Sequence, residues 1–312
     1  MNPTLSIVTT LYQSESYVDK FLDSALRAGE EFGGEFEIVL VDDGSPDSSY
    51  QIAKARAAID GRIRAIQLTR NFGHHPAFWC AMELSRGDYC FLIDSDLEVN
   101  PEILSKFRSL LQSTKADVVY GVQEQRKGER SARLLGGVFW KLFSKLSDIE
   151  VPRDIMTERL MSRRYLDALL SMGDYNLFLG GMFFWPGFYQ VPISITKVPR
   201  KDASTYNFAK RAKLLAEAVS SFSSMPLKLI FWMGISISIL TGFYSVYLLF
   251  QKLVFPDTIL GGFTFLALMS AMSFGLLSVS IGVTGLYIHK IFRQTQNRPK
   301  YIIKEAYSKL DE

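Results

Sequence analysis

The sequence predicts an α/β domain with a mostly parallel sheet, followed by two membrane-spanning helices. In the first 225 residues, apolar strand-like runs alternate with segments of helical spacing, as is typical of a parallel sheet covered on both faces. Two uncharged stretches follow, at residues 230–250 and 258–288, and each is long enough to cross a bilayer. Acidic residues end two of the strand-like runs, at the edge where ligands bind to such sheets.

The expected elements have local reasons in the sequence. The second helix begins where Ser45 or Asp47 can accept hydrogen bonds from unpaired amides, and the fourth follows Asn100, a typical cap, with Pro101 in its first turn. The expected strands are residues 5–10, 36–41, 63–68, 89–93 and 118–120. The expected helices are residues 17–28, 47–58, 76–85 and 101–112.

The charge balance indicates a membrane rather than nucleic acid. The formal net charge of +3 is too small to predict nucleic-acid binding, so no such partner is expected. Basic residues flank the apolar pair on both sides, namely Arg211, Lys213, Lys228, Lys290, Arg293, Arg298, Lys300 and Lys304. The positive-inside rule therefore predicts a multi-pass protein of the inner (cytoplasmic) membrane, with the large domain and both termini in the cytoplasm.

The N-terminal residues and the cysteines agree with a cytosolic domain. Residues 1–10 have neither a basic start nor a cleavage site, so no signal peptide is expected. Cys80 and Cys90 are the two cysteines of the chain, which predicts no disulfide framework, and both are expected to be buried and reduced.

Composition divides the chain into four parts: a soluble domain at 1–206, an amphipathic helix at 207–225, a membrane region at 226–290 and a cytosolic tail at 291–312. The segment 207–224 and a second amphipathic one, 131–147, have two interpretations. They either cover the sheet or lie in the membrane interface, because apolar area with basic charge favours anionic lipid surfaces.

Small residues recur every four positions in the second apolar stretch. Ala271 and Gly275 form one such pair, and Ser278 and Gly282 form another. Small residues at this spacing allow a neighbouring helix to approach closely. The neighbour is the first span, another subunit or both, so a homo-oligomer is one expectation; the alternative is that these small residues have no packing role.

Three alternating acids follow the fourth strand. On an extended segment, Asp94, Asp96 and Glu98 would share one face. Three oxygen donors on one face suit Mg²⁺ or Mn²⁺, and such a cation would stabilise a diphosphate as a leaving group. The alternative is that these are exposed loop acids that cap the next helix.

A second acidic turn follows the second strand. Asp42 and Asp43 can accept hydrogen bonds from a nucleobase N–H or from ribose hydroxyls, although the turn before a helix is itself an alternative role. After the third strand, Arg70 and Asn71 are placed to line a nucleotide site. The adjacent His74 and His75 are not expected to bind metal together, because sequence neighbours rarely point the same way.

These motifs together resemble glycosyltransferase family 2 with the GT-A fold, and more closely its polyprenyl-phosphate glycosyltransferases, the group that includes dolichol-phosphate mannose synthase. The resemblance runs in order along nearly the whole chain, through VDDGS at 41–45, RNFGH at 70–74, DSDLE at 94–98 and NRPKY at 297–301. Further matching segments are residues 5–15, 120–122, 159–163 and 204–206.

The resemblance implies roles on the donor side. Glu15, Asp42 and Asp43 would surround the base and ribose. Asp94 would lie near the ribose and diphosphate. Asp96 would bind the Mg²⁺ or Mn²⁺ ion, with Asp94 nearby and Glu98 assisting.

On the acceptor side, Arg126 and Arg159 would face the acceptor phosphate, with Arg130 as a third candidate, because a guanidinium fork suits phosphate oxygens. The alternative for each arginine is a surface salt bridge. Ser204 and Tyr206 occupy a loop that lies near donor and acceptor in this family. The candidate catalytic residues are thus Asp94, Asp96, Arg126 and Arg159.

Several positions depart from the family pattern, and they bear on the sugar and on the acceptor phosphate. Glu98 stands where a glutamine is common, which adds charge near the metal. Other departures are Gln13, Gln123, Thr157, Glu158 and Gly181.

The activity implied is inverting, metal-dependent transfer of a sugar from a nucleotide diphosphate sugar to polyprenyl phosphate at the cytoplasmic face of the lipid bilayer. One alternative is a membrane-attached enzyme of the same family that acts on a polysaccharide or lipid-linked oligosaccharide. The other is a non-catalytic scaffold, although the intact Asp94 and Asp96 argue against it.

Overall fold

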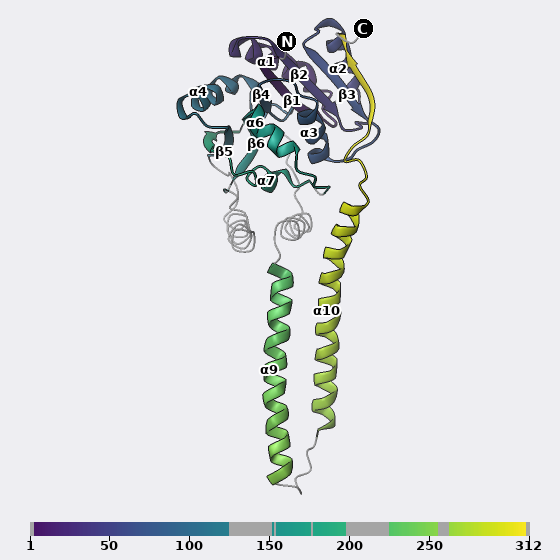
Figure 1. Ribbon diagram of the computed structural model, residues 1–312. Helices are drawn as coiled ribbons and strands as arrows, with labels where there is room; N and C mark the ends of the chain where they lie inside the picture. Colours follow the sequence, from purple (N-terminus) through teal and green to yellow (C-terminus); the bar gives the residue numbers. More distant parts are fainter. Residues whose placement is uncertain are drawn as a thin grey trace.

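In the computed structural model, residues 3–124, 152, 154–175, 177–197, 225–254 and 262–309 are described. These residues form an eight-stranded sheet with helices on both faces and two long helices that extend from it (Figure 1). The strand order is β7-β5-β6-β4-β1-β2-β3-β8.

The first five strands and first four helices confirm the elements expected from the sequence, with shifted ends. The strands are β1 (Leu5–Leu11), β2 (Phe36–Asp42), β3 (Ile63–Leu68), β4 (Tyr89–Leu92), β5 (Val118–Gln123), β6 (Ile155–Ser162), β7 (Gln190–Ile195) and β8 (Ile303–Ser308). The helices are α1 (Val18–Phe32), α2 (Ser49–Ile59), α3 (His74–Glu83), the short 3₁₀ helix η1 (Pro101–Ile103), α4 (Leu104–Thr114), α6 (Arg163–Leu170), α7 (Leu179–Met182), α9 (Met225–Val254) and α10 (Phe263–Thr295).

The sheet is mostly parallel, as expected. β1 pairs in parallel with β2 and with β4, β2 pairs in parallel with β3, and β5 with β7. The strand β6 runs against its neighbours β4 and β5, and β8 runs against β3. Consequently β1, β2 and β4 end at the same edge of the sheet, and their last residues define the edge on which the acids lie.

Each face of the sheet carries its own apolar core. On one face, Phe21 of α1 and Phe107 of α4 pack with Phe91 of β4, and the last two rings meet edge to face at 5.4 Å. On the other, Phe78 of α3 and Tyr165 of α6 are buried with the underside of the same strands. These side chains are almost entirely removed from water, which is the main favourable contribution to folding.

A buried glutamate, Glu37, lies at the edge of the sheet opposite the acidic residues. Glu37 accepts hydrogen bonds through Oε1 from the Ser6 hydroxyl (2.7 Å) and the Arg86 backbone amide (2.7 Å), and its Oε2 pairs with Arg64 Nη1 at 3.0 Å. The Gly87 amide in turn donates to Ser6 Oγ at 2.8 Å. A buried carboxylate requires such partners. Because Ser6, Glu37 and Arg64 belong to β1, β2 and β3, these contacts fix the register of the three neighbouring strands.

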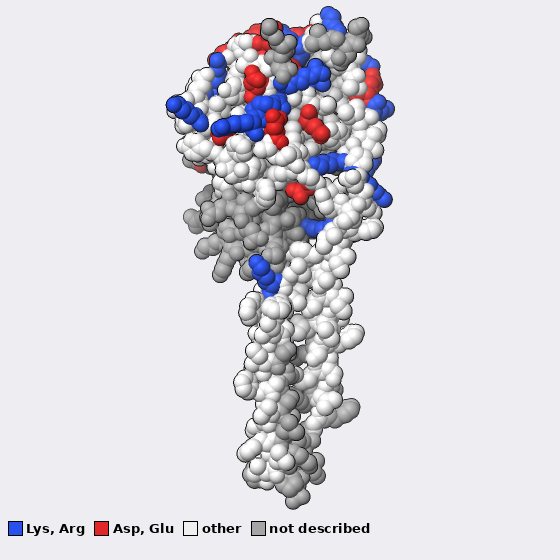
Figure 2. All heavy atoms as spheres, in the orientation of Figure 1, with Lys and Arg blue, Asp and Glu red and all other residues white. Residues whose placement is uncertain are grey.

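Two helices are long and apolar enough to cross a membrane, by length and composition. α9 has 30 residues and α10 has 33, and they leave the domain side by side (Figure 1). On the face shown in Figure 2, charged side chains lie on the domain and near its junction with the helices. The first helix extends the expected span of 230–250 at both ends. The second begins five residues later than the expected 258–288 and continues to Thr295, into the basic segment.

The C-terminal segment corrects one expected boundary. Residues 291–312 were expected to form a separate tail, but residues 303–308 form the edge strand β8 of the domain sheet. The adjacent charges Lys304 and Glu305 interrupt any apolar pattern in this segment, and its partner β3 precedes both long helices in the chain. β6, β7, α6 and α7 were likewise not expected.

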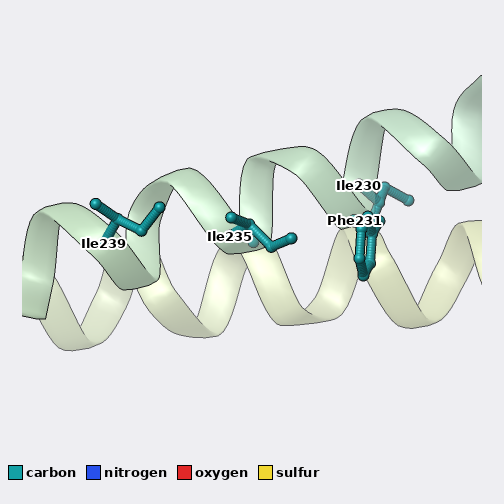
Figure 3. A pocket seen from close by; sticks show the side chains of 5 residues that line it. Ile230, Phe231, Ile235 and Ile239 are labelled. Atoms are coloured by element: carbon teal, nitrogen blue, oxygen red, sulfur yellow. The ribbon is translucent and has the colours of Figure 1, made fainter.

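Other expectations lie outside the described residues. Two of these are the amphipathic segments 131–147 and 207–224. A shallow apolar groove of about 520 Å³ lies on α9, lined by Gly234 and by the four side chains labelled in Figure 3: Ile230, Phe231, Ile235 and Ile239. It contains no polar side chain that would orient a ligand.

Replacement of Phe91 tests the importance of the central strand. Phe91→Ala removes a fully buried ring against Phe107, and it should lower the free energy of unfolding by about 3–5 kcal/mol. Denaturant unfolding in detergent, followed by tryptophan fluorescence, measures this. Lys106→Ala, at an exposed position of α4, is the control and should change stability by less than about 0.5 kcal/mol. Equal stability of the two variants would contradict the packing described.

Candidate active site

The two acidic motifs lie on either side of β1 at one edge of the sheet. Asp42 is the last residue of β2, and Asp94 follows β4 by two residues. Because β1 pairs in parallel with both strands, their carboxyl ends point the same way. The sequence prediction that both motifs share this edge is confirmed by these strand pairings, and we call this part of the molecule the acid edge.

Asp43 joins the turn after β2 to the loop after β3. Its Oδ1 accepts a hydrogen bond from the Phe72 amide (2.7 Å) and its Oδ2 from the Gly73 amide (2.9 Å). The two segments pack so closely at Gly44, where φ is 63°, that a Cβ atom would lie 2.5 Å from the carbonyl carbon of Arg70. The two Asp43 carboxylate oxygens, which were expected to face the nucleotide, thus also hold the loop after β3 in place.

Asp42 is buried with one oxygen left unpaired. Its Oδ2 accepts from the Ser45 amide at 3.2 Å and from Gln67 Nε2 at 3.5 Å, whereas Oδ1 has no hydrogen-bond partner. Burial raises the pKa of Asp42 to about 6. An unpaired carboxylate oxygen in an apolar setting has a strong preference for a donor such as a base N–H.

Glu15 and Asp47 both accept hydrogen bonds from backbone amides at the start of α2. The Ser48 amide donates to Glu15 Oε2 at 3.1 Å, and the Ser49 amide donates to Asp47 Oδ1 at 3.1 Å. Asp47 also accepts from the Glu15 amide at 3.2 Å, so the two segments hold each other. Of the two expected caps, Asp47 accepts the amide hydrogen bond of the first helical residue.

Arg70 presents an exposed cation beside this group. Its guanidinium carbon lies 4.1 Å from the centre of the Phe72 ring, and Nη1 donates to the Asn71 carbonyl at 3.2 Å. Stacking on the ring orients the guanidinium while leaving donors free for an anion.

The three alternating acids do not share one face, as was expected for an extended segment. Residues 94–98 turn instead of continuing the strand, because Leu97 has a φ of 59°, so alternate side chains no longer share one face. Asp96 Oδ1 accepts the Glu98 amide at 3.0 Å within this turn. Among the described residues, no three His, Cys, Asp or Glu side chains converge as metal ligands.

A lysine holds the third acid. Lys197 Nζ lies 2.8 Å from Glu98 Oε2, and both side chains are largely buried. Nearby, Glu158 of β6 is fully buried with Oε2 unpaired. Burial, followed by the neighbouring Asp94 charge, raises the pKa of Glu158 to about 7, and burial followed by the Asp96 charge raises the pKa of Asp94 to about 6.

The two adjacent histidines contact different partners, as expected. His74 Nε2 lies 3.6 Å from Asp94 Oδ1, and burial lowers the pKa of His74. His75 Nδ1 lies 2.9 Å from the Leu177 carbonyl oxygen, in the loop between α6 and α7. The first histidine therefore contributes to the acid edge and the second to the neighbouring loop.

Arg159 lies in the core rather than at an open surface. It is only 1% exposed, and its guanidinium stacks over the Phe183 ring at 3.3 Å and donates to the Met156 carbonyl at 3.1 Å. Burial lowers the pKa of Arg159 to about 10, and Nη1 has no partner. Neither expectation, an open phosphate contact or a surface salt bridge, describes this placement, because β6 is sandwiched between β4 and β5. Arg126, Arg130, Ser204 and Tyr206 lie outside the described residues.

Three contributors were missed in the sequence: Glu158, Lys197 and His74. For Glu158, the signal available in the sequence was a glutamate within the strand β6. Lys197 lies 99 positions after Glu98 in the sequence, so nothing local indicated that the two side chains would pair.

Comparison with known proteins identifies the family. Residues 6–170 match the family described as Glycosyl transferase family 2, and this covers more than half of the chain. A putative glycosyltransferase of Mycobacterium tuberculosis (strain CDC 1551 / Oshkosh) is 37% identical over 303 residues, which cover 97% of this chain and 88% of that protein. The chain belongs to glycosyltransferase family 2.

Other relatives of this glycosyltransferase carry more specific names. The SfII prophage-derived bactoprenol glucosyl transferase of Shigella flexneri is 29% identical over 311 residues, covering 97% of this chain and 98% of the relative. Among solved structures, glucosyl-3-phosphoglycerate synthase from Mycobacterium tuberculosis, in complex with Mn²⁺, UDP-glucose and phosphoglyceric acid, has a TM-score of 0.47. It is 19% identical, and the match covers 70% of this chain and 79% of that one.

Removal of the charge at Asp42 should stabilise this glycosyltransferase and weaken nucleotide binding. The folded-state pKa of about 6 lies above the ordinary 3.8, so this group's contribution to stability decreases as the pH rises between those values. Asp42→Asn should therefore melt at a higher temperature than the wild type at about pH 8, and the difference should shrink as the pH falls below about 6.

Thermal unfolding in detergent measures the first effect, and calorimetric titration with nucleoside diphosphates measures the second. Affinity should fall about tenfold or more if Oδ1 receives the base. A lower melting temperature at about pH 8, or unchanged nucleotide affinity, would contradict this interpretation of Asp42.

Removal of the Lys197 charge should strengthen divalent cation binding. Lys197→Gln frees Glu98 and removes a positive charge from the acid edge. The affinity for Mn²⁺ without nucleotide, measured from the electron paramagnetic resonance signal of free Mn²⁺, should rise about tenfold, or about 1.4 kcal/mol. Lys106→Gln is the matched exposed control. Unchanged or weaker binding in Lys197→Gln would show that the ion pair does not compete with the cation.

Proposed function

We propose that this glycosyltransferase transfers a sugar from a nucleotide diphosphate sugar to a polyprenyl phosphate at the cytoplasmic face of the membrane, with inversion and with a divalent cation. The observation that carries the proposal is the combination of an acid edge and two apolar helices in one chain. The bactoprenol glucosyl transferase of Shigella flexneri matches across 97% of the chain, so the likeness includes both parts.

The donor nucleotide would lie along the ends of β1, β2 and β3. Asp42 Oδ1 offers a buried acceptor for a base N–H, and Glu15 lies across the turn from it. Arg70 brings a positive charge to the same edge. Asp94 lies on the other side of β1, where the ribose and diphosphate would extend.

The residues at the acid edge fit a Mg²⁺ or Mn²⁺ ion that shares its ligands with the donor. Such ions are typically held by one or two carboxylates and by substrate phosphate oxygens, and Asp94 and Asp96 are the candidates with Glu98 assisting. A site with only one or two carboxylate ligands agrees with the lack of a preformed three-ligand group among the described residues. When bound, the ion would neutralise charge on the departing diphosphate.

The acceptor phosphate needs little help from a protein base. Its oxygen is already anionic near neutral pH, so it can attack the anomeric carbon directly from the face opposite the diphosphate, which inverts that carbon. The protein would then act by positioning and by charge stabilisation. Arg126 remains the proposed acceptor-side residue, and Arg130, Ser204 and Tyr206 are further candidates, whereas the burial of Arg159 removes it from this role.

The proposed location is the inner membrane, with the domain and both termini in the cytoplasm. Basic residues flank the apolar pair on both sides, and α9 and α10 return the chain to the side on which it started. A polyprenyl phosphate in this leaflet would present its phosphate toward the domain.

Product analysis tests the activity directly. Purified protein, polyprenyl phosphate, Mg²⁺ or Mn²⁺ and a panel of nucleotide sugars should give a metal-dependent polyprenyl-phosphate sugar with inverted anomeric configuration. Nucleotide binding without lipid product would instead favour another acceptor.

Replacement of Asp96 tests the metal assignment. Asp96→Asn should lower the transfer rate about 10²–10³-fold, because the neutral amide would hold less firmly the divalent cation that would stabilise the departing diphosphate. The fold should persist, since the asparagine oxygen can still accept the Glu98 amide. Asp88→Asn, an exposed acid near the opposite edge of the sheet, is the control. Wild-type activity in Asp96→Asn would refute the assignment.

A further inference from the structure

The NRPKY segment at 297–301 has a structural position that the proposed chemistry does not explain. α10 ends at Thr295, and Asn297 follows with a φ of 48°, a left-handed residue typical of the end of a helix. From there the chain runs along the side of the domain to β8 (Figure 1, yellow). We call residues 293–301 the joint, because they connect a long apolar helix to the domain.

The last turn of α10 contacts the loop between α6 and α7. Gln294 Oε1 accepts the Tyr175 amide at 2.8 Å, and its Nε2 donates to the Gly173 carbonyl at 2.7 Å. Arg293 Nη2 donates to the Tyr175 hydroxyl at 3.0 Å, and its guanidinium carbon lies 4.7 Å from the centre of that ring. These contacts fix the direction of the helix as well as its end.

The second half of the joint packs on α3. Lys300 Nζ lies 3.8 Å from the centre of the Trp79 ring and donates to the Met172 carbonyl at 3.3 Å. The Tyr301 hydroxyl donates to Glu83 Oε2 at 2.8 Å. Beyond it, the Thr69 amide donates to the Ile302 carbonyl at 2.9 Å, and the pairing of β8 with β3 begins.

The same two elements that receive the joint also position the acid edge. α3 carries His74 at its first residue, and that histidine contacts Asp94. The loop that receives Gln294 continues to Leu177, whose carbonyl oxygen lies 2.9 Å from His75 Nδ1. The helix end and the acid edge are therefore connected through α3 and the loop that packs against its first turn.

We propose that the joint fixes the position of the acid edge relative to the membrane, so that Gln294, Lys300 and Tyr301 are positioning residues for a membrane-bound acceptor. The inference rests on the proposed function. An acceptor phosphate held in a bilayer has its height set by the lipid, whereas the height of the acid edge is set by α10 and its attachment.

The length of α10 supports this assignment. Its 33 residues correspond to about 50 Å, whereas the hydrocarbon core of a bilayer is about 30 Å thick. The last turns therefore extend beyond the hydrocarbon and act as a stalk. A stalk transmits a defined position only if its attachment is rigid, and a misplacement of about 1 Å can reduce a rate about 10²-fold.

The test uses the full chain in lipid nanodiscs with the double variant Gln294→Ala and Tyr301→Phe. Three quantities are measured: transfer to a long polyprenyl phosphate in the bilayer, transfer to a short water-soluble prenyl phosphate, and nucleotide affinity. Thr295→Ala is the matched control, because the Thr295 hydroxyl donates within its own helix to Phe292. The pairing of β8 with β3 remains in the double variant, so the fold should persist.

Transfer to the long acceptor should fall at least about tenfold, while the other two quantities and the control change less than about twofold. An equal fall for both acceptors would show a merely structural role and overturn the inference. Unchanged transfer to the long acceptor would also overturn it. If the wild type uses neither prenyl phosphate, the proposed function fails and the geometric measurement below decides whether the joint fixes the domain.

The geometric measurement needs no activity. Nitroxide labels on Lys115→Cys in the domain and Leu286→Cys on α10 report the distance between domain and stalk, and both native cysteines are buried. Electron–electron resonance should give a narrow distance distribution in the parent protein and a broad one in the double variant. A broad distribution in the parent, or an unchanged one in the double variant, would overturn the inference.

Discussion

The two hydrogen bonds from the Phe72 and Gly73 amides to Asp43 are the interaction on which most of this molecule depends. They join the turn after β2 to the loop after β3, and they determine where α3 begins. The position of α3 brings His74 to Asp94 and presents Trp79 and Glu83 to the joint. One carboxylate thus links the proposed nucleotide side, the acid edge and the attachment of the long apolar helix α10.

The acid edge contains buried carboxyl groups, and burial makes their charged form energetically costly. Asp42, Asp94 and Glu158 all have pKa values raised by burial, and two of them retain an unpaired oxygen. Fully satisfied polar groups at the opposite edge, around Glu37, stabilise the fold, whereas unsatisfied ones at the acid edge reduce its stability. Unpaired buried polar atoms are typical of binding sites in which the ligand supplies the missing hydrogen-bond partners. This difference distinguishes the acid edge, which would bind ligands, from the opposite edge, which stabilises the fold.

The sequence predicted the first five strands and their shared edge because period and turn residues are local signals. It could not predict Leu97 with its positive φ, since nothing local requires that conformation of leucine, and the error removed the expected three-acid metal face. Lys197 and β8 were missed for another reason. Their partners, Glu98 and β3, are distant in the chain, and only tertiary packing brings them together. The family resemblance located Asp94 and Asp96, but not the burial of Arg159 behind Phe183.

The edge strand β8 has a consequence for biosynthesis. It pairs with β3, although α9 and α10 lie between the two strands in sequence. During translation, the first seven strands emerge before the apolar helices, and the sheet is completed only after both helices have been synthesised. Until then the outer edge of β3 has no strand paired with it, and an unpaired strand edge can pair with other chains. Completion of the catalytic domain therefore requires synthesis of both long apolar helices, and a chain truncated before β8 would leave that edge permanently exposed.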